Sequence, residues 1–124
     1  MKSLSCIMER NATYYDLLSC LFSMNDLEIA VLKSLRDSGK ANLDELAEVV
    51  KRNRSTVFKA LGKLVSMGLV NQYNEPLQRG GRVSYYYPAE TGKIVDLIAR
   101  KRMEICASFD TLIEKITFET HRIS

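Results

Sequence analysis

The sequence predicts a mainly helical domain of the α+β class that carries one small β-hairpin and ends in a long helix. Three observations support this prediction. Apolar residues recur at three- and four-residue steps through the first half of the chain, two β-rich segments flank a Gly-Gly pair near residue 80, and a long periodic segment fills the C-terminal third. The chain has 124 residues, of which 46% are hydrophobic and 27% charged, and this suits one domain with a single core.

The first two helices are predicted from their apolar stripes. We expect the first to span residues 6–22 and the second to run from Asp26 to Asp37. Asn25 is a suitable N-cap for the second helix, because Glu28 stands three residues later in the capping-box position. Gly39 should end this helix, since glycine readily takes the left-handed conformation of a C-terminal cap.

The next two helices are predicted to be short and joined by a tight turn. The third should run from Leu43 to Lys51 behind an Asn42 cap, and the fourth from Arg54 to Met67 behind an Asn53 cap. Gly68 should end the fourth helix. The connection is so short that the pair must form a helix–turn–helix.

Two strands should follow these helices. Residues 69–73 favour the first strand, the polar run 74–81 favours a turn, and the β-branched and aromatic run 82–87 favours the second strand before Pro88. Side-chain alternation should turn Tyr86 to the opposite face from its two tyrosine neighbours. The strands therefore predict a hairpin that packs at least one tyrosine on the helices.

The last helix should run from about residue 92 to 121, roughly 40 Å at ~1.5 Å per residue. Its apolar residues approximate a heptad seam, interrupted at Lys101 and Arg102. Because a core this small cannot cover so long a helix, part of its apolar face should meet a second copy of the chain. The predicted dimer interface comprises Leu17, Leu21, Ile98, Ile105, Phe109, Leu112 and Ile116. We divide the single domain into an N-terminal helix (1–24), a central unit (25–88) and a dimerisation helix (89–124).

The order of helices and hairpin is that of a winged helix-turn-helix. The stretch LDELAEVVKRNRSTVFKALGKLVSMGLV, residues 43–70, resembles the helix-turn-helix of MarR-like and TrmB-like regulators, and the overall plan is similar to the small archaeal Lrs-type regulators. The resemblance is good over residues 43–70, moderate over the hairpin and architectural at both ends. It implies a dimeric DNA-binding transcriptional regulator.

Charge is concentrated in one part of the chain. Residues 51–87, the basic segment, hold seven Lys or Arg and one Glu, for a net charge of +6 within a chain of net charge +3. A contiguous positive segment is typical of a surface that binds a polyanion. The candidate DNA-binding residues are Arg52, Asn53, Arg54, Ser55, Thr56, Phe58, Lys59, Lys63, Arg79 and Arg82.

Each candidate has a chemical reason. The N-terminal turn of a recognition helix leads into the major groove, where its amides favour phosphate and Arg54 can reach a phosphate or guanine O6/N7. Lys59 and Lys63 share a polar face, and Phe58 could contact a thymine methyl group. Arginines at a hairpin tip, here near residues 79–82, suit a minor groove or flanking backbone. Two subunits should then read half-sites about one helical turn, ~34 Å, apart.

Several alternatives remain open at this point. The two lysines could form an ordinary solvated face, the hydroxyls could only cap the helix, and Phe58 could pack under the wing. On DNA, the rival is an architectural chromatin-type protein with low sequence specificity. Off DNA, the rival is a winged-helix module that binds other proteins, although the charge of the basic segment argues against it.

Other classes are disfavoured by what the sequence lacks. Cys6, Cys20 and Cys106 are scattered and look like buried structural residues, and with His121 as the single histidine we expect no metal site and no cofactor. No nucleophile–base set is evident, so we expect no enzyme. The chain has no membrane-length apolar run or signal peptide, so we expect a cytoplasmic protein. Nothing marks an effector site.

Overall fold

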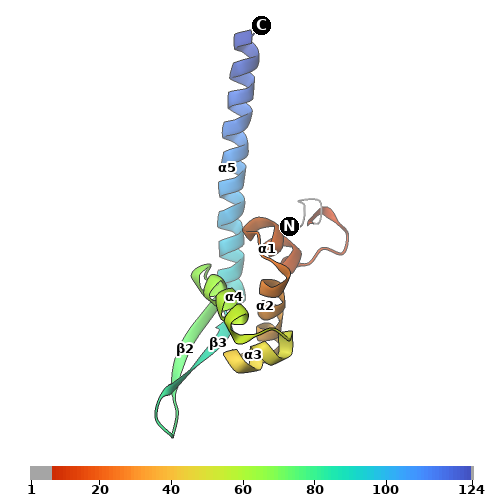
Figure 1. Ribbon diagram of the computed structural model, residues 1–124. Coiled ribbons are helices and arrows are strands. Elements are labelled where there is room, and N and C mark those ends of the chain that lie inside the picture. The colour runs from red at the N-terminus through yellow and green to blue at the C-terminus, as the bar shows by residue number, and fades with distance from the viewer. Residues whose placement is uncertain (1–6, 124) are drawn as a thin grey trace.

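The computed structural model describes residues 7–123, with side chains described as far as residue 120. Five helices and three short strands form one helical body from which a hairpin projects at one end and a long helix at the other (Figure 1). The elements are α1 (Tyr14–Phe22), α2 (Asp26–Ser38), β1 (Ala41–Asn42), α3 (Leu43–Val50), α4 (Arg54–Ser66), β2 (Val70–Pro76), β3 (Arg82–Pro88) and α5 (Thr91–Ile123). The predicted winged helix-turn-helix with a long C-terminal helix is therefore confirmed.

Asparagine caps set the start of three helices, as predicted. The side chains of Asn25, Asn42 and Asn53 each accept a hydrogen bond from the backbone N–H three residues later, at 2.8 to 2.9 Å. Three residues after Asn25 and Asn42 stands a glutamate, whose carboxylate accepts a hydrogen bond from the backbone N–H of the capping asparagine. These caps fix where α2, α3 and α4 begin, and so fix the length of the turns between them.

The core lies where α2, α3 and α4 cross beneath the sheet. Leu32 and Leu35 of α2 are fully buried against Leu61 and Leu64 of α4, and Leu46 of α3 closes the same cluster. Val57, Leu61 and Leu64 are all fully buried and recur at four- and three-residue steps, so one side of α4 faces the core. Since each buried leucine is worth about 2 kcal/mol or more, these contacts hold α4 against the rest of the body.

The sheet has one strand more than predicted. β3 pairs antiparallel with β2 on one side and with β1 on the other, in the order β1-β3-β2, so that Ala41 lies opposite Tyr86. A two-residue strand has no periodicity of its own, and this one exists because β3 offers it free backbone groups. Tyr86 is buried toward the helices and Tyr87 is exposed, as the alternation predicted.

The hairpin is also longer than predicted. Asn74, Glu75 and Pro76 were expected in the turn, but they belong to β2 and pair with residues 82–84 of β3. The Ser84 hydroxyl donates to Asn74 at 2.7 Å, so cross-strand side-chain bonds offset the poor strand preference of these residues. Pro76 is tolerated because it ends the strand.

The first helix begins later than predicted. α1 starts behind a Thr13 cap, where Asp16 accepts hydrogen bonds from the Thr13 backbone N–H and hydroxyl. Residues 7–11 before it form a short 3-10 segment, a bend and a turn. The expected start at Cys6 lies outside the described residues. The capping box at Thr13 outcompetes the apolar residues before it. α1 contacts α5, which at 33 residues is about 50 Å long, longer than expected.

We predict opposite stability changes at two adjacent positions of α4. Leu61→Ala should lower the free energy of unfolding by about 3 kcal/mol, because it opens a cavity in the core. Gly62→Ala should raise it by about 0.5 to 1 kcal/mol, because a methyl group there meets no atom within 4 Å and alanine favours the helix. Urea unfolding followed by circular dichroism measures both. A loss of stability for Gly62→Ala would contradict this placement of α4.

Candidate nucleic-acid interface

The turn between α3 and α4 sets the direction of the second helix. Lys51 takes a left-handed backbone conformation (φ 56°) and its N–H donates to the Ala47 carbonyl, which closes α3. Arg52 follows, exposed, and its N–H also donates to Ala47. Asn53 then caps α4. A left-handed residue reverses the chain within three residues, which is why two short helices can cross so close together.

The N-terminal turn of α4 is exposed but already hydrogen-bonded. The Asn53 side-chain oxygen accepts bonds from the Thr56 N–H at 2.9 Å and from the Ser55 hydroxyl at 3.0 Å. Ser55 is exposed and Thr56 is half-buried. Asn53 is therefore the cap of α4, and the Ser55 hydroxyl donates to this cap instead of accepting from a backbone amide. These bonds do not prevent the exposed amides from meeting an anion.

Arg54 forms an ion pair that sequence reasoning missed. Its Nε lies 2.8 Å from Oδ1 of Asp44 in α3, and the two side chains are 68% and 72% exposed. A pair this exposed contributes little stability. The carboxylate therefore holds the guanidinium loosely and competes with any phosphate or base for it.

Phe58 and Lys59 point away from the core. Phe58 is 57% exposed, so the alternative in which it packs as core under the wing is wrong. Lys59 is exposed one position further along α4. An exposed aromatic ring beside a lysine gives this face of the helix both an apolar and a cationic contact group.

Lys63 differs from the prediction, which placed it with Lys59 on an open face. Its ammonium lies 3.1 Å from Oε2 and 3.2 Å from Oε1 of Glu28, and 3.4 Å from the Ser23 carbonyl. Glu28 is only 2% exposed, whereas the Lys63 side chain is 44% exposed. The pair joins α4 to the start of α2. It could have been suspected from Glu28, which sits at a cap yet falls on the buried side of its helix.

The wing places the second basic group at the far end of the sheet. Arg79 lies in the turn and Arg82 begins β3 opposite Pro76, and both are exposed. Gly80 and Gly81 both have positive φ values, 88° and 83°, which lets the turn close tightly. The hairpin projects beyond the helices, and β2 contacts α4 at its base (Figure 1). The basic residues of the turn are thus carried away from the body.

A tyrosine cluster stiffens the base of the wing. Tyr73 and Tyr85 stack across the two strands with centroids 5.7 Å apart, and Lys40 lies over both rings and donates to the Tyr73 hydroxyl at 3.2 Å. This hydrogen bond raises the pKa of Lys40. The contact ties the loop after α2 to the wing. The sequence predicted that at least one of the three tyrosines packs on the helices, but it did not predict the contact of Lys40 with Tyr73 and Tyr85.

Residues 18–91, from α1 to the first residue of α5, match the family described as the sugar-specific transcriptional regulator TrmB. This match covers more than half of the chain. The chain belongs to the TrmB family. This TrmB-family protein is a DNA-binding transcriptional regulator and not an enzyme, and the predicted resemblance to TrmB-like regulators is confirmed.

Relatives of this TrmB-family chain occur in archaea. It is 33% identical over 86 residues to the uncharacterized protein MJ1082 of Methanocaldococcus jannaschii, covering 69% of this chain and 71% of the relative. It is 27% identical over 110 residues to the uncharacterized protein MJ1503 of the same organism, covering 86% and 81%. A possible transcriptional regulator from Methanosarcina mazei Go1 has the same fold, with a TM-score of 0.74, 18% identity and coverage of 86% and 93%.

Two further findings concern the described residues alone. Between residues 7 and 123 no helix combines the length and the apolar character needed to cross a bilayer. Over the same range no group of His, Cys, Asp and Glu side chains is placed to hold a metal ion.

We predict that Lys63 stabilises the fold through Glu28. Lys63→Met should lower the free energy of unfolding by about 1 to 2 kcal/mol, because it leaves a buried carboxylate without its cation. Adding Glu28→Gln should recover part of this loss. Lys59→Met is the matched control and should change stability by less than about 0.5 kcal/mol. Urea titrations at one protein concentration would contradict the role if both lysine variants behaved alike.

Proposed function

We propose that this TrmB-family protein acts as a homodimer that binds double-stranded DNA selectively, with α4 in the major groove and the wing on the flanking backbone or minor groove. The observation that carries the proposal is the exposure of Arg54, Phe58 and Lys59 on α4 together with Arg79 and Arg82 on the wing. These side chains have no role in the core. Helix and wing contact each other at the base of β2, so both groups belong to one rigid body.

The first turn of α4 would lead into the groove. Its N-terminal amides and helix dipole favour a phosphate. The helix has 13 residues and is about 20 Å long, and a major groove ~12 Å wide admits an α-helix. Arg54 is the residue best placed to exchange Asp44 for a phosphate or a guanine edge. Lys59 would contact the backbone further along, and Phe58 offers contact to a thymine methyl.

Lys63 has a different part in this proposal. Because its ammonium is bound to Glu28, it supports the recognition helix from behind and adds little direct contact to DNA. Asn53 likewise acts mainly by capping α4, and the Ser55 hydroxyl donates to that cap. The set of side chains that reach DNA is therefore smaller than the sequence suggested.

Architectural binding is the second candidate, and one observation favours it. At the start of α4 the Asn53 side-chain oxygen already accepts hydrogen bonds from the Ser55 hydroxyl and the Thr56 N–H. The exposed groups that remain are mostly cations. Cations can serve phosphates without reading sequence. If this second function holds, DNA binding persists but selectivity does not.

Selection from a random duplex library separates the two candidates. Repeated rounds of binding at about 150 mM salt should enrich a symmetric pair of short motifs if the protein is sequence-selective. If the selected library binds the protein no more tightly than the starting library does, the protein is architectural. A protein that binds no duplex even at low salt, where counterion release favours any cationic surface, would overturn the proposal altogether.

We predict that the exposed cations of α4 and of the wing contribute independently to the affinity for duplex DNA. Lys59→Ala and Arg82→Ala should each weaken binding and lower the slope of log affinity against log salt by about 1, since each removes roughly one phosphate contact. Lys115→Ala, an exposed lysine on the distal half of α5, removes the same charge and is the control. Mobility-shift titrations at several salt concentrations test this. Equal losses in all three variants would indicate only a net-charge effect.

We predict that Asp44 restrains Arg54. Asp44→Asn should tighten duplex binding several-fold, because it frees the guanidinium and removes a negative charge beside the phosphates. In an Arg54→Ala background the same change should give a smaller gain, since only the charge effect remains. The double-mutant cycle isolates the pair. Identical gains in both backgrounds would show that Asp44 and Arg54 do not compete.

A further inference from the structure

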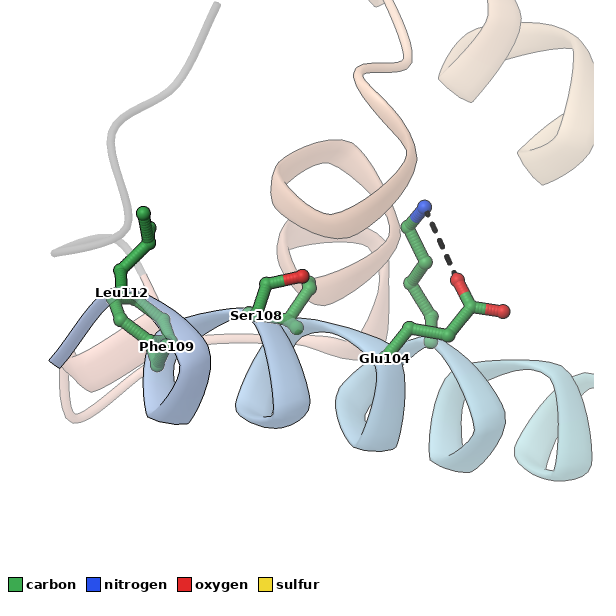
Figure 2. A pocket seen from close by; sticks show the side chains of 6 residues that line it. Glu104, Ser108, Phe109 and Leu112 are labelled. Carbon is green, nitrogen blue, oxygen red and sulfur yellow. Dashed lines mark ion pairs between the residues drawn. The ribbon is translucent and has the colours of Figure 1, made fainter. Parts of the chain in front are cut away.

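Leu77 is an exposed apolar side chain that lies outside the dimer interface predicted on α5. Most exposed apolar side chains of the described residues lie on α5, where Phe109 and Leu112 line an open groove (Figure 2). The homodimer that we propose would cover that groove. Leu77 lies instead in the turn at the end of the wing, and it is 50% exposed. Dimerisation through α5 therefore does not account for it.

Hydrogen bonds of the turn fix the backbone of Leu77. Its N–H donates to the Gly81 carbonyl at 3.0 Å, and its carbonyl accepts a bond from the Gly80 N–H at 3.1 Å. Pro76 precedes it, pairs with Arg82 and has a φ that its own ring restricts. Leu77 thus belongs to a closed turn at the end of the hairpin, which projects beyond the helices (Figure 1). We call residues 77–81 the wing tip.

Little of the subunit covers the Leu77 side chain. Gly81 stands across the turn and has no side chain, and a methyl group at Gly80 or at Gly81 would meet no neighbouring atom within 4 Å. Among the described residues, Leu77 does not belong to the apolar set that packs on the core. Single exposed leucines are common on protein surfaces, but turns favour Gly, Pro, Asn, Asp and Ser. A leucine at this position contributes little to the packing of the subunit itself.

Two arginines flank this leucine. Arg79 lies within the wing tip and Arg82 directly follows it, and both are exposed. Neither forms an ion pair with another described residue. Glu75 is the one acidic residue of the hairpin, and it stands two residues before Leu77, about 7 Å farther from the tip at ~3.4 Å per residue. The wing tip therefore combines one apolar side chain with two free cations.

The minor groove of duplex DNA offers chemistry that matches this combination. Phosphates line both of its rims, and the stacked bases between them have apolar faces. Proteins that bind there often insert an apolar side chain, such as leucine, between two base pairs, which unstacks them and kinks the duplex. The groove is only ~6 Å wide, so the segment that inserts must be narrow. Gly80 and Gly81 keep bulky side chains away from Leu77, and glycine permits a close approach of the backbone.

From the exposed leucine, the two arginines and the narrow turn, we propose that Leu77 is a wedge that enters the minor groove, inserts at a base-pair step and bends the duplex. The proposal rests on the proposed binding of double-stranded DNA and adds DNA bending to it. Arg79 and Arg82 neutralise phosphates beside the step, while Leu77 covers the base faces that the kink exposes. Burial of the leucine offsets part of the cost of unstacking, so the wedge changes the shape of the DNA more than the affinity.

Bending also selects sequence without reading the edges of bases. Pyrimidine–purine steps such as TA are kinked and unstacked most easily, so the deformation costs least where such a step meets Leu77. The exposed groups of α4 are mostly cations, which serve phosphates whatever the sequence. The wedge thus supplies a sequence preference that those cations do not. In the homodimer, the two wings would place one such step on each flank of the bound site.

Fluorescence energy transfer across a bound duplex tests the wedge in the full chain. The probe is an A·T-rich duplex of about 30 base pairs that contains several TA steps and carries donor and acceptor dyes at its two ends. Measurements are made at salt low enough for fluorescence anisotropy to show saturation. The protein should raise the transfer efficiency, because a bend of about 20 to 90° brings the ends together. Leu77→Gln should lose most of this rise while its affinity falls by less than about tenfold, and Leu77→Met should keep it.

The neighbouring residue of the turn provides the matched control. Gln78→Ala should leave both the bend and the affinity unchanged, and circular dichroism checks that each variant keeps the fold. A duplex that is bound but not bent, or a bend that survives Leu77→Gln, would overturn the wedge and leave the proposed DNA contacts standing. Equal losses in Leu77→Gln and Gln78→Ala would also overturn it. Absence of binding even at low salt would overturn both proposals.

A second readout uses the unmodified protein and reports on the base step itself. 2-Aminopurine replaces one adenine at a different TA step in each of a series of duplexes, and its fluorescence rises when it is unstacked. The protein should raise the fluorescence several-fold at one or two of these positions, and Leu77→Gln should abolish the rise. No rise at any position, with the duplex saturated, would contradict insertion of Leu77 even if the DNA were bent.

Discussion

The packing of α2 against α4 is the contact on which the rest of this structure depends. Leucines from both helices bury one another completely, and at the rim of that contact the Lys63 ammonium meets the nearly buried Glu28 carboxylate. The apolar part supplies the stability and sets how α4 is rotated about its own axis, and the ion pair joins the rim of α4 to the start of α2. Rotation matters because a helix that reads DNA must present the same narrow face each time. The exposed residues of α4 are useful only because the buried ones leave them a single orientation.

The long C-terminal helix has more apolar surface than the described residues of the subunit cover. α1 and the winged body cover the beginning of α5, and the side chains of residues 106–120 are all exposed among the described residues. An isolated helix with a half-exposed apolar stripe gains little from its own side chains, because helical stability in proteins comes mainly from packing. In the homodimer that we propose, this exposed part of α5 would form one half of the interface. The family match ends at Thr91, the first residue of α5.

Much of the fold could be predicted from local signals in the sequence. Three asparagine caps, one leucine stripe and the glycines that end the helices were enough to place α2, α3 and α4, because each depends on neighbours within four residues. β1 could not be predicted, since two residues become a strand only when β3 lies beside them. Nor could the partners of Arg54 and Lys63 be predicted, because Asp44 and Glu28 reach them through the crossing of helices. For the same reason Phe58 could be assigned to the core or the surface only after the wing was placed. The caps thus predict where elements begin, and the tertiary contacts decide which charges are free.

The left-handed residue in the turn before α4 has a consequence of its own. Lys51 holds a positive φ without being glycine, which costs roughly 1 kcal/mol relative to a residue with no Cβ. A glycine there would relax the turn, but it would also delete one of the seven cations of the basic segment. Position 51 therefore cannot have both an unstrained backbone and a positively charged side chain. The chain gives up a little folding free energy at position 51 and keeps a charge next to α4, the helix that we propose enters the major groove.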